Sequence, residues 1–270
     1  IIQSGNDATV ALAEYVGGTE DGFVDLMNSY AASMGLSNTL FQNSTGLPDG
    51  NHFSSAKDLA TMTSMLINNF PGTYSLYKEK YYTFNNIRQP NRNRLLWKDN
   101  SSDGVKTGHT ESAGYCLISS AKRNDMRLIA VVAGAKSDKD RFNDTQRLLE
   151  YGFRFYSTQE VIKKDNALKD VDVWGGKKDL VSLGAENNIK LTLPRTTFKN
   201  ITISYDFQNN LRAPIKEGQT LGTLVIKDGE KTLHTENLVA LNDVEAKGFF
   251  GRLWASFVLW FRGLFGLGDA

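Results

Sequence analysis

One change of periodicity, close to residue 157, constrains the fold of this chain more than any other feature. Before it, most segments repeat apolar residues at the three- and four-residue spacing of helices. After it come six short, β-rich segments separated by turn residues, at 171–174, 180–183, 189–193, 201–205, 221–226 and 232–239. This change predicts an α+β unit followed by a small all-β unit. The length of 270 residues allows two cores of unequal size.

The first unit is predicted to place helices against an antiparallel sheet. Two apolar patterns of helical spacing each end at glycines, and the polar turn 122–125 joins two apolar, β-rich runs into a hairpin. The expected elements are two helices within 7–35, a helix from near Ser54 to before Pro71, strands at 113–121 and 127–135, and a helix over 138–156. We expect three parts: residues 1–156, a β-sandwich-like domain over 157–246, and a terminal segment over 247–270.

Composition excludes several classes of function. The net charge is +1 and 23% of residues are charged, which is ordinary for a globular protein and does not indicate binding to nucleic acid. The single cysteine, Cys116, allows no internal disulfide, and the three histidines at 52, 109 and 234 show no metal-ligand spacing. We therefore expect no metal and no cofactor.

Two short strings carry candidate chemistry. Lys106-Thr107-Gly108 is predicted at the entry of the hairpin, where a cation, a hydroxyl and a glycine at a sheet edge would suit an anionic substrate. Ser4 and Asn6 lie about 100 residues earlier, immediately before a helix, where a hydroxyl and an amide are able to relay a proton and hold a carbonyl. Alone, the first string also fits an exposed turn, and Asn6 also fits a helix cap.

Taken together, in this order and spacing, the strings resemble the second and third motifs of the penicillin-recognising serine enzymes, S-x-N and K-T-G, which follow an S-x-x-K motif. Further segments are similar to the low-molecular-mass D,D-carboxypeptidases of this group, among them 41–43, 54–60, 91–97, 103–110, 152–155, 193–195 and 248–251. The resemblance covers essentially the whole chain. It implies a transpeptidase-like α+β catalytic domain, a small β domain and a membrane-anchoring helix.

The resemblance also implies roles for individual residues. Ser4 and Asn6 would assist proton transfer and substrate holding, and Lys106 with Thr107 and Gly108 would face the substrate. The backbone N–H of His109 would complete an oxyanion hole, and Arg141 would pair with the free carboxylate of the substrate. The implied reaction removes the terminal D-alanine from peptidoglycan pentapeptide stems through an acyl-enzyme, which β-lactam antibiotics trap. Arg141 also fits a solvated position in the first turn of a helix.

The nucleophilic motif of the family is not at its expected place. Two S-x-x-K strings occur, at Ser54–Lys57 and Ser119–Lys122, but both follow Ser4, which reverses the order in the family. We interpret Ser54 as a helix cap and Ser119 as part of a strand. The chain opens without methionine or a leader-like segment. We therefore expect it to lack the N-terminal portion of the parent enzyme and to be inactive alone.

The terminal segment predicts attachment to a membrane surface. In a helix over 249–267, six apolar residues would share one face, namely Phe250, Trp254, Phe257, Phe261, Leu264 and Phe265. Such a helix is predicted to lie in the plane of the membrane surface, because two arginines and several glycines argue against a spanning segment. The resemblance implies the periplasmic face of the bacterial inner membrane.

Two other classes of function remain open from the sequence. A β-lactamase shares the recognition motifs but needs a deacylating glutamate, and no Glu-x-x-x-Asn string lies between Ser4 and Lys106. A chain with the substrate cleft and no nucleophile would instead bind peptidoglycan stems, or act as a structural protein at the membrane.

Overall fold

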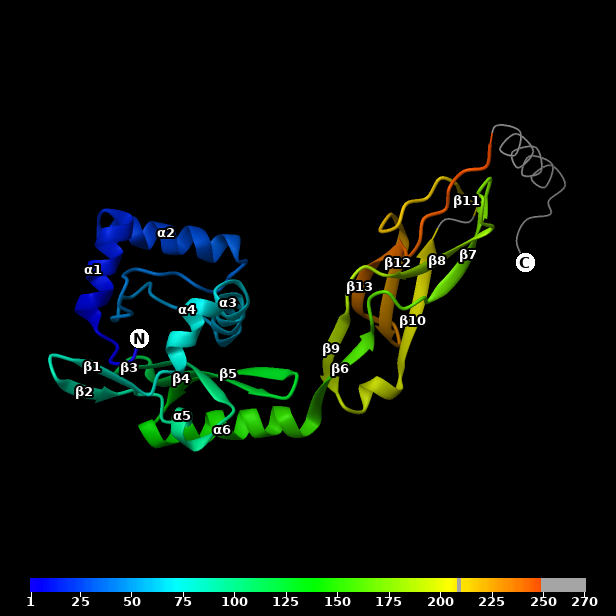
Figure 1. Cartoon of the computed structure of the whole chain (residues 1–270). Helices are drawn as coiled ribbons and strands as arrows, with labels where there is room; N and C mark the ends of the chain where they lie inside the picture. The colour runs from blue at the N-terminus through cyan, green and yellow to red at the C-terminus, as the bar shows by residue number, and fades with distance from the viewer. Residues whose placement is uncertain (208–209, 249–270) are drawn as a thin grey trace. The chain divides into compact units, whose positions relative to one another are not determined.

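The computed structural model describes residues 1–207 and 210–248. The chain divides into two compact units, an N-terminal unit over Ile1–Phe155 and a C-terminal unit from Tyr156 onward. Figure 1 shows both, and each is described by itself below. The predicted terminal helix over 249–267, with its anchor residues Phe250, Trp254, Phe257, Phe261 and Phe265, lies outside the described residues.

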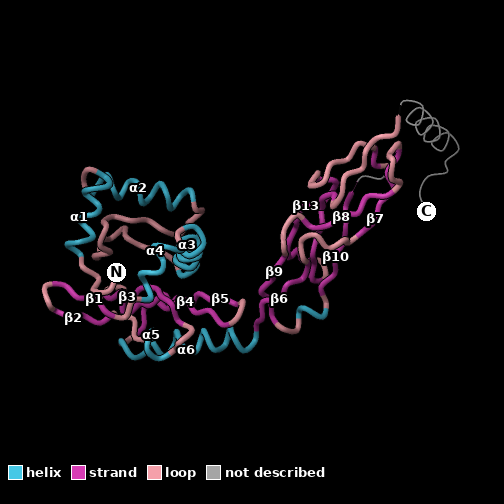
Figure 2. Tube along the Cα trace, viewed as in Figure 1, coloured by secondary structure: helices cyan, strands magenta, loops and turns pink. Residues whose placement is uncertain are grey.

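Helices form much of the N-terminal unit (Figure 2). They are α1 (Asn6–Gly17), α2 (Glu20–Ser33), α3 (Ala56–Asn69), the one-turn helices α4 (Pro71–Tyr74), η1 (Ser75–Lys78) and α5 (Leu95–Lys98), and α6 (Asp138–Phe155). Helix α1 ends at Gly18, whose φ of 78° is the left-handed conformation that glycine adopts without steric cost. The Thr19 hydroxyl then accepts the Gly22 N–H and caps α2.

The predicted cap of the third helix was misplaced by one residue. The Ser55 hydroxyl, not that of Ser54, accepts the Asp58 N–H at 3.1 Å and caps α3. Ser54 Oγ instead lies 2.9 Å from Thr39 Oγ1. Both serines precede the helix, and only tertiary contacts decide which hydroxyl turns toward its first turn.

A three-stranded antiparallel sheet is the centre of the N-terminal unit. It consists of β3 (Ser102–Thr110), β4 (Gly114–Arg123) and β5 (Met126–Ala135), in that order. Helix α6 packs on β4 and β5, and α3 contacts β5; Figure 1 shows these two helices on opposite faces of the sheet. A separate hairpin, β1 (Tyr81–Phe84) with β2 (Ile87–Pro90), precedes α5.

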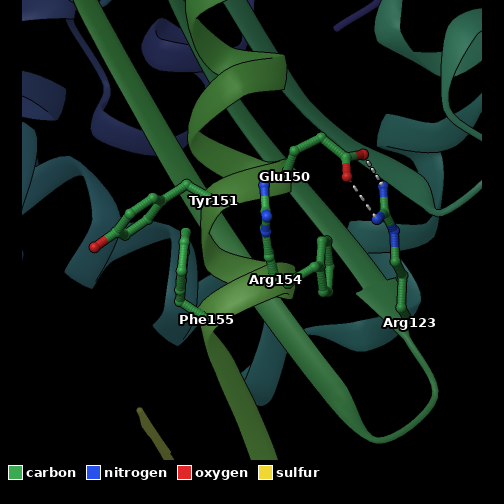
Figure 3. A pocket seen from close by; sticks show the side chains of 6 residues that line it. Arg123, Glu150, Tyr151, Arg154 and Phe155 are labelled. Atoms are coloured by element: carbon green, nitrogen blue, oxygen red, sulfur yellow. Dashed lines mark hydrogen bonds and ion pairs between the residues drawn. The ribbon is translucent and has the colours of Figure 1, made fainter. Parts of the chain in front are cut away.

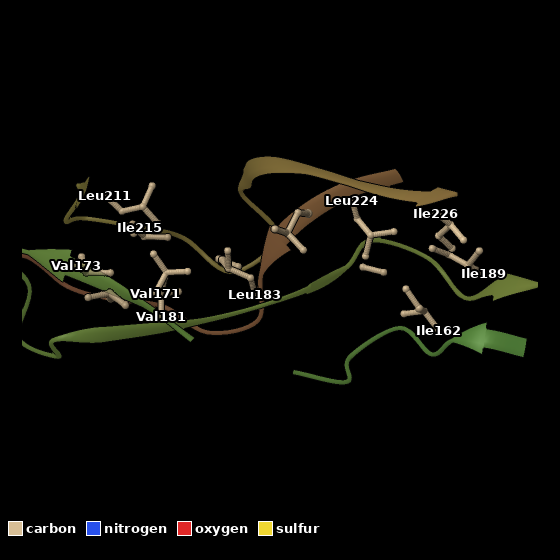
Figure 4. Close-up of a cluster of buried hydrophobic side chains, with 14 residues drawn as sticks. Ile162, Val171, Val173, Val181, Leu183, Ile189, Leu211, Ile215, Leu224 and Ile226 are labelled. Carbon is tan, nitrogen blue, oxygen red and sulfur yellow. The ribbon is translucent and has the colours of Figure 1, made fainter. Parts of the chain in front are cut away.

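The C-terminal unit is formed by strands. One sheet has the order β10-β12-β13-β8-β7-β11, and a second pairs β6 with β9. The bounds are β6 (Tyr156–Ile162), β7 (Lys169–Trp174), β8 (Leu180–Ala185), β9 (Ile189–Pro194), β10 (Ile201–Phe207), β11 (Leu211–Arg212), β12 (Thr220–Asp228) and β13 (Lys231–Ala240), with the 3₁₀ turn η2 (Thr197–Lys199). Alternate aliphatic side chains of these strands form the core in Figure 4, where Leu183, Leu224 and Ile226 are fully buried.

Candidate active site

The K-T-G string lies inside a strand, not at the entry of the predicted hairpin. Strand β3 carries it, pairing Lys106 with Ile118 and Gly108 with Cys116 of β4. The prediction missed this strand because its residues are mostly polar or glycine and lack the β-branched alternation that marks strands. Strand β3 is nevertheless the edge of its sheet, as expected for a residue set that receives a ligand.

The structure brings the two candidate strings together. Lys106 Nζ donates to Ser4 Oγ at 2.8 Å, although 102 residues separate them, and also to the Thr107 carbonyl at 2.6 Å. Ser4 has a φ of 58°, a left-handed conformation that is uncommon for serine. Gly5 is the N-cap residue of α1, so Asn6 is its first helical residue and does not act as the cap. Ser4 and Asn6 are both exposed.

The Lys106 ammonium lies in an electropositive, partly buried environment. Burial, followed by the positive charges of Arg92 and Arg141, lowers its pKa from the ordinary value of 10.5 to about 8. Lys106 is therefore mostly charged at neutral pH, yet poorly solvated and close to other cations. A carboxylate or a developing oxyanion bound here would restore the stabilisation that this charge lacks.

The residues beside Lys106 differ in exposure. Thr107 is 7% exposed, whereas Gly108 and His109 are exposed near the end of β3. The rings of His109 and Tyr115 lie 4.0 Å apart between centroids, across the β3–β4 pairing. The His109 side chain is thus engaged with the Tyr115 ring, and the oxyanion role of its backbone N–H stays a prediction.

Arg141 is buried rather than solvated. It lies in the first turns of α6, and its Nη1 donates to the Gly108 carbonyl at 2.9 Å and to the Cys116 carbonyl at 3.4 Å. Its Nη2 donates to the carboxylate of Asp138, and Nε is buried without a hydrogen-bond partner among the described residues. The guanidinium therefore bonds the backbone of the K-T-G residues at Gly108, near the end of β3.

Buried side chains that the sequence did not single out fix the start of β3. The Gly104 carbonyl accepts from Asn93 Nδ2 at 3.0 Å and from Ser119 Oγ at 3.1 Å. Asn93 and Ser119 are fully buried. The β3–β4 register shifts between Ser102 and Gly104, so side chains take the place of regular strand pairing there. The 91–93 segment was noted only for its resemblance to the family.

The two S-x-x-K strings are structural in this chain. Ser119 is 0% exposed and its hydroxyl donates to the Gly104 carbonyl, so it is closed to any substrate. Ser54 bonds to Thr39 in the loop before α3. Ser119 lies within β4, as the sequence predicted, while the cap role expected of Ser54 belongs to Ser55.

A separate hollow of about 520 Å³ lies at the C-terminal end of α6 (Figure 3). It is lined by Arg123, Glu150, Tyr151, Phe153, Arg154 and Phe155. Arg123 donates to both oxygens of Glu150, at 3.2 and 2.6 Å, and is also paired with Asp99. The Arg123 charge is thus neutralised within the protein, and the hollow does not include any residue of the Ser4–Lys106 group.

Comparison with known proteins matches both units of the chain to a family. A family model described as D-alanyl-D-alanine carboxypeptidase matches residues 1–137, and one described as penicillin-binding protein 5, C-terminal domain, matches residues 156–246. The chain is 47% identical to the D-alanyl-D-alanine carboxypeptidase DacC of Escherichia coli, over 98% of this chain and 67% of that protein. It spans about two thirds of the length of the curated relatives that it matches.

Solved structures agree with the sequence comparison. Penicillin-binding protein 5 from Haemophilus influenzae superposes with a TM-score of 0.76 at 41% identity, over 90% of this chain and 71% of that chain. Penicillin-binding protein D2 from Listeria monocytogenes, solved in a cefotaxime-bound form, matches with a TM-score of 0.53 at 34% identity, over 57% of this chain and 63% of that chain. The chain therefore belongs to the family of serine-type D-alanyl-D-alanine carboxypeptidases that includes the penicillin-binding proteins 5 and 6.

Proposed function

We propose that the protein removes the terminal D-alanine from peptidoglycan pentapeptide stems through an acyl-enzyme, and that β-lactam antibiotics bind at the same site. The observation that carries this proposal is the 2.8 Å hydrogen bond between Lys106 Nζ and Ser4 Oγ. It joins the S-x-N string to the K-T-G string within β3, the two motifs of a carboxypeptidase family. The named carboxypeptidase relatives support the same reaction.

In this proposal each residue has a separate chemical role. Ser4 Oγ, already hydrogen-bonded to Lys106, passes a proton between the nucleophilic serine of the family's S-x-x-K motif and the leaving amine, and the Asn6 amide holds the substrate carbonyl. The Lys106 ammonium and the Thr107 hydroxyl stabilise negative charge on the substrate. The exposed end of β3 at Gly108 and His109 lets a peptide backbone approach, with the His109 N–H donating to the oxyanion.

Arg141 supplies the preference for a free carboxyl terminus. Its guanidinium donates to the Gly108 carbonyl, so a substrate extended along β3 places its terminal carboxylate near this charge. Neither Ser54 nor Ser119 is the nucleophile, because both hydroxyls are engaged in structural hydrogen bonds. We further propose attachment to the periplasmic face of the inner membrane through the terminal segment. No described helix is long and apolar enough to cross a membrane.

The test compares two lysines of strands β3 and β4 in the native protein. Lys106→Ala is expected to lower the rate of D-alanine release from a pentapeptide by about 100-fold or more, the usual loss when a preorganised electrostatic group is removed. Lys122→Ala, which changes an exposed lysine of β4 and the second S-x-x-K string, is the matched control and should retain the wild-type rate. Equal rates for all three proteins would reject the proposed site.

A further inference from the structure

The polar groups of Arg141 are already engaged inside the protein. Its side chain is 8% exposed. Nη1 is used by two backbone carbonyls, of Gly108 and Cys116, and Nη2 by the Asp138 carboxylate. Nε is buried and has no partner among the described residues. A ligand carboxylate that reaches Arg141 therefore meets a guanidinium whose Nη2 already donates to the Asp138 carboxylate.

The Asp138 carboxylate lies between two arginine side chains, in the arrangement of a bound anion. Asp138 is the first residue of α6, and its side chain is 33% exposed. One carboxylate oxygen accepts from Arg141 Nη2 and the other lies 3.4 Å from Arg94 Nη1, whose side chain is 69% exposed. An anion held between a buried and an exposed guanidinium, next to the end of β3, occupies the position that suits the carboxyl terminus of a peptide.

We propose that Asp138 is a specificity-determining residue: its carboxylate accepts from Nη2 of Arg141 and competes with the terminal carboxylate of a peptide ligand. The inference rests on the role proposed above for Arg141. Because Asp138 competes for Arg141, the preference for ligands with a free carboxylate is weaker than Arg141 alone would give. Neutral ligands do not face this competition, because they do not need the guanidinium edge.

The chain contains a matched control for this pair. Asp144 and Arg147 repeat the Asp-x-x-Arg spacing six residues later on α6, with a nitrogen–oxygen distance of 3.4 Å. That pair is solvent-exposed, with side chains 48% and 81% exposed, and among the described residues it forms no hydrogen bond or ion pair with Arg141. Asp144→Asn therefore removes the same charge from the same helix without opening Arg141.

The experiment measures dissociation constants of two non-hydrolysable ligands for the native protein, Asp138→Asn and Asp144→Asn. The ligands are N-acylated D-alanyl-D-alanine analogues with a ketomethylene in place of the scissile amide, one ending in a free carboxylate and one in a carboxamide. Asp138→Asn should bind the carboxylate ligand roughly three- to tenfold more tightly than wild type, because partly exposed ion pairs have small net energies. Binding of the carboxamide should not change, and Asp144→Asn should match wild type for both.

Equal or weaker binding of the carboxylate ligand by Asp138→Asn, including no detectable binding, overturns the inference; weaker binding would show that Asp138 positions Arg141 instead. If Asp138→Asn does not fold, Asp138→Ser is measured under the same criterion. The proposed reaction is judged separately, by D-alanine release. A protein that gains carboxylate affinity on Asp138→Asn without releasing D-alanine would retain this inference and reject the enzyme.

Discussion

At the scale of single residues, Lys106 shows a functional group held in an environment that disfavours its charge. Its pKa of about 8 lies below the ordinary value of 10.5 because of burial and the neighbouring Arg92 and Arg141. Between these two values the unfolded chain binds a proton that the folded chain does not. Folding stability from this group therefore rises with pH between about pH 8 and 10.5. Below about pH 8, the free energy of unfolding carries the full penalty of the charged, buried Lys106.

The first prediction follows from this linkage. Lys106→Met keeps the length of the side chain and removes the charge, so its free energy of unfolding relative to wild type should be highest below about pH 8. That advantage should shrink between about pH 8 and 10.5, where the folded protein holds Lys106 neutral while the unfolded chain still binds the proton. Urea unfolding at pH 7, 9 and 10.5 measures it. A difference that stays constant across these pH values would show that Lys106 titrates as a free lysine.

Short motifs led to the predicted site residues. Ser4, Asn6 and Lys106 were proposed from spacing and resemblance, and Arg141 from the position that the family resemblance gives it; the structure brings Lys106 to Ser4 and Arg141 to the Gly108 carbonyl, and their roles stay predictions. Asn93 and Ser119 were not found as site residues, because their shared partner is a backbone carbonyl that no sequence pattern marks. The Asp138–Arg141 pair has i,i+3 helical spacing, a local signal from which sequence reasoning could have found it.

At the scale of elements, the start of β3 depends on buried hydrogen bonds. Asn93→Ala removes the donor to the Gly104 carbonyl and the acceptor of the Leu95 N–H, both in the interior. The expected loss is about 1–3 kcal/mol of unfolding free energy, the usual cost of leaving buried polar groups unpaired. Urea unfolding measures this loss. Asn100→Ala, at an exposed position nearby, should change stability by less than about 0.5 kcal/mol, and a similar result for both variants would contradict the assignment.

The start of helix α3 gives a second prediction for an element. Ser55→Ala should lower the free energy of unfolding by about 0.5–2 kcal/mol, because it removes the acceptor of the Asp58 N–H. Ser54→Ala should cost less, since its hydroxyl bonds only to the Thr39 side chain near the surface. Thermal unfolding of the two variants decides between the serines. A larger loss for Ser54→Ala would favour the cap predicted from sequence.

Elements with strong periodicity were predicted well, and those set by tertiary context were not. The six strands expected after residue 157 all form, as β7, β8, β9, β10, β12 and β13. Strand β6 was missed because it begins at Tyr156, directly where α6 ends, and the helical spacing was extended through that residue. Strand β3 was missed because its polar residues and glycines follow no apolar alternation.

At the scale of the whole molecule, the chain divides into two compact units. Leu224, which is 0% exposed, lies in a cluster of buried side chains that all belong to the C-terminal unit. Leu224→Ala should cost about 2–5 kcal/mol there, through lost burial and a residual cavity. Amide hydrogen exchange should show weaker protection in β12 and β13 while β3 and β4 remain unchanged. Loss of protection in β3 would show that the two units unfold together.

The central claim is that the Ser4–Lys106 group belongs to a penicillin-binding serine carboxypeptidase. The most direct test is the intact mass of the native protein, isolated from membranes, before and after incubation with a penicillin. The account predicts a mass gain equal to one drug molecule, retained in Lys122→Ala and greatly reduced in Lys106→Ala. A native protein whose mass does not change would contradict it.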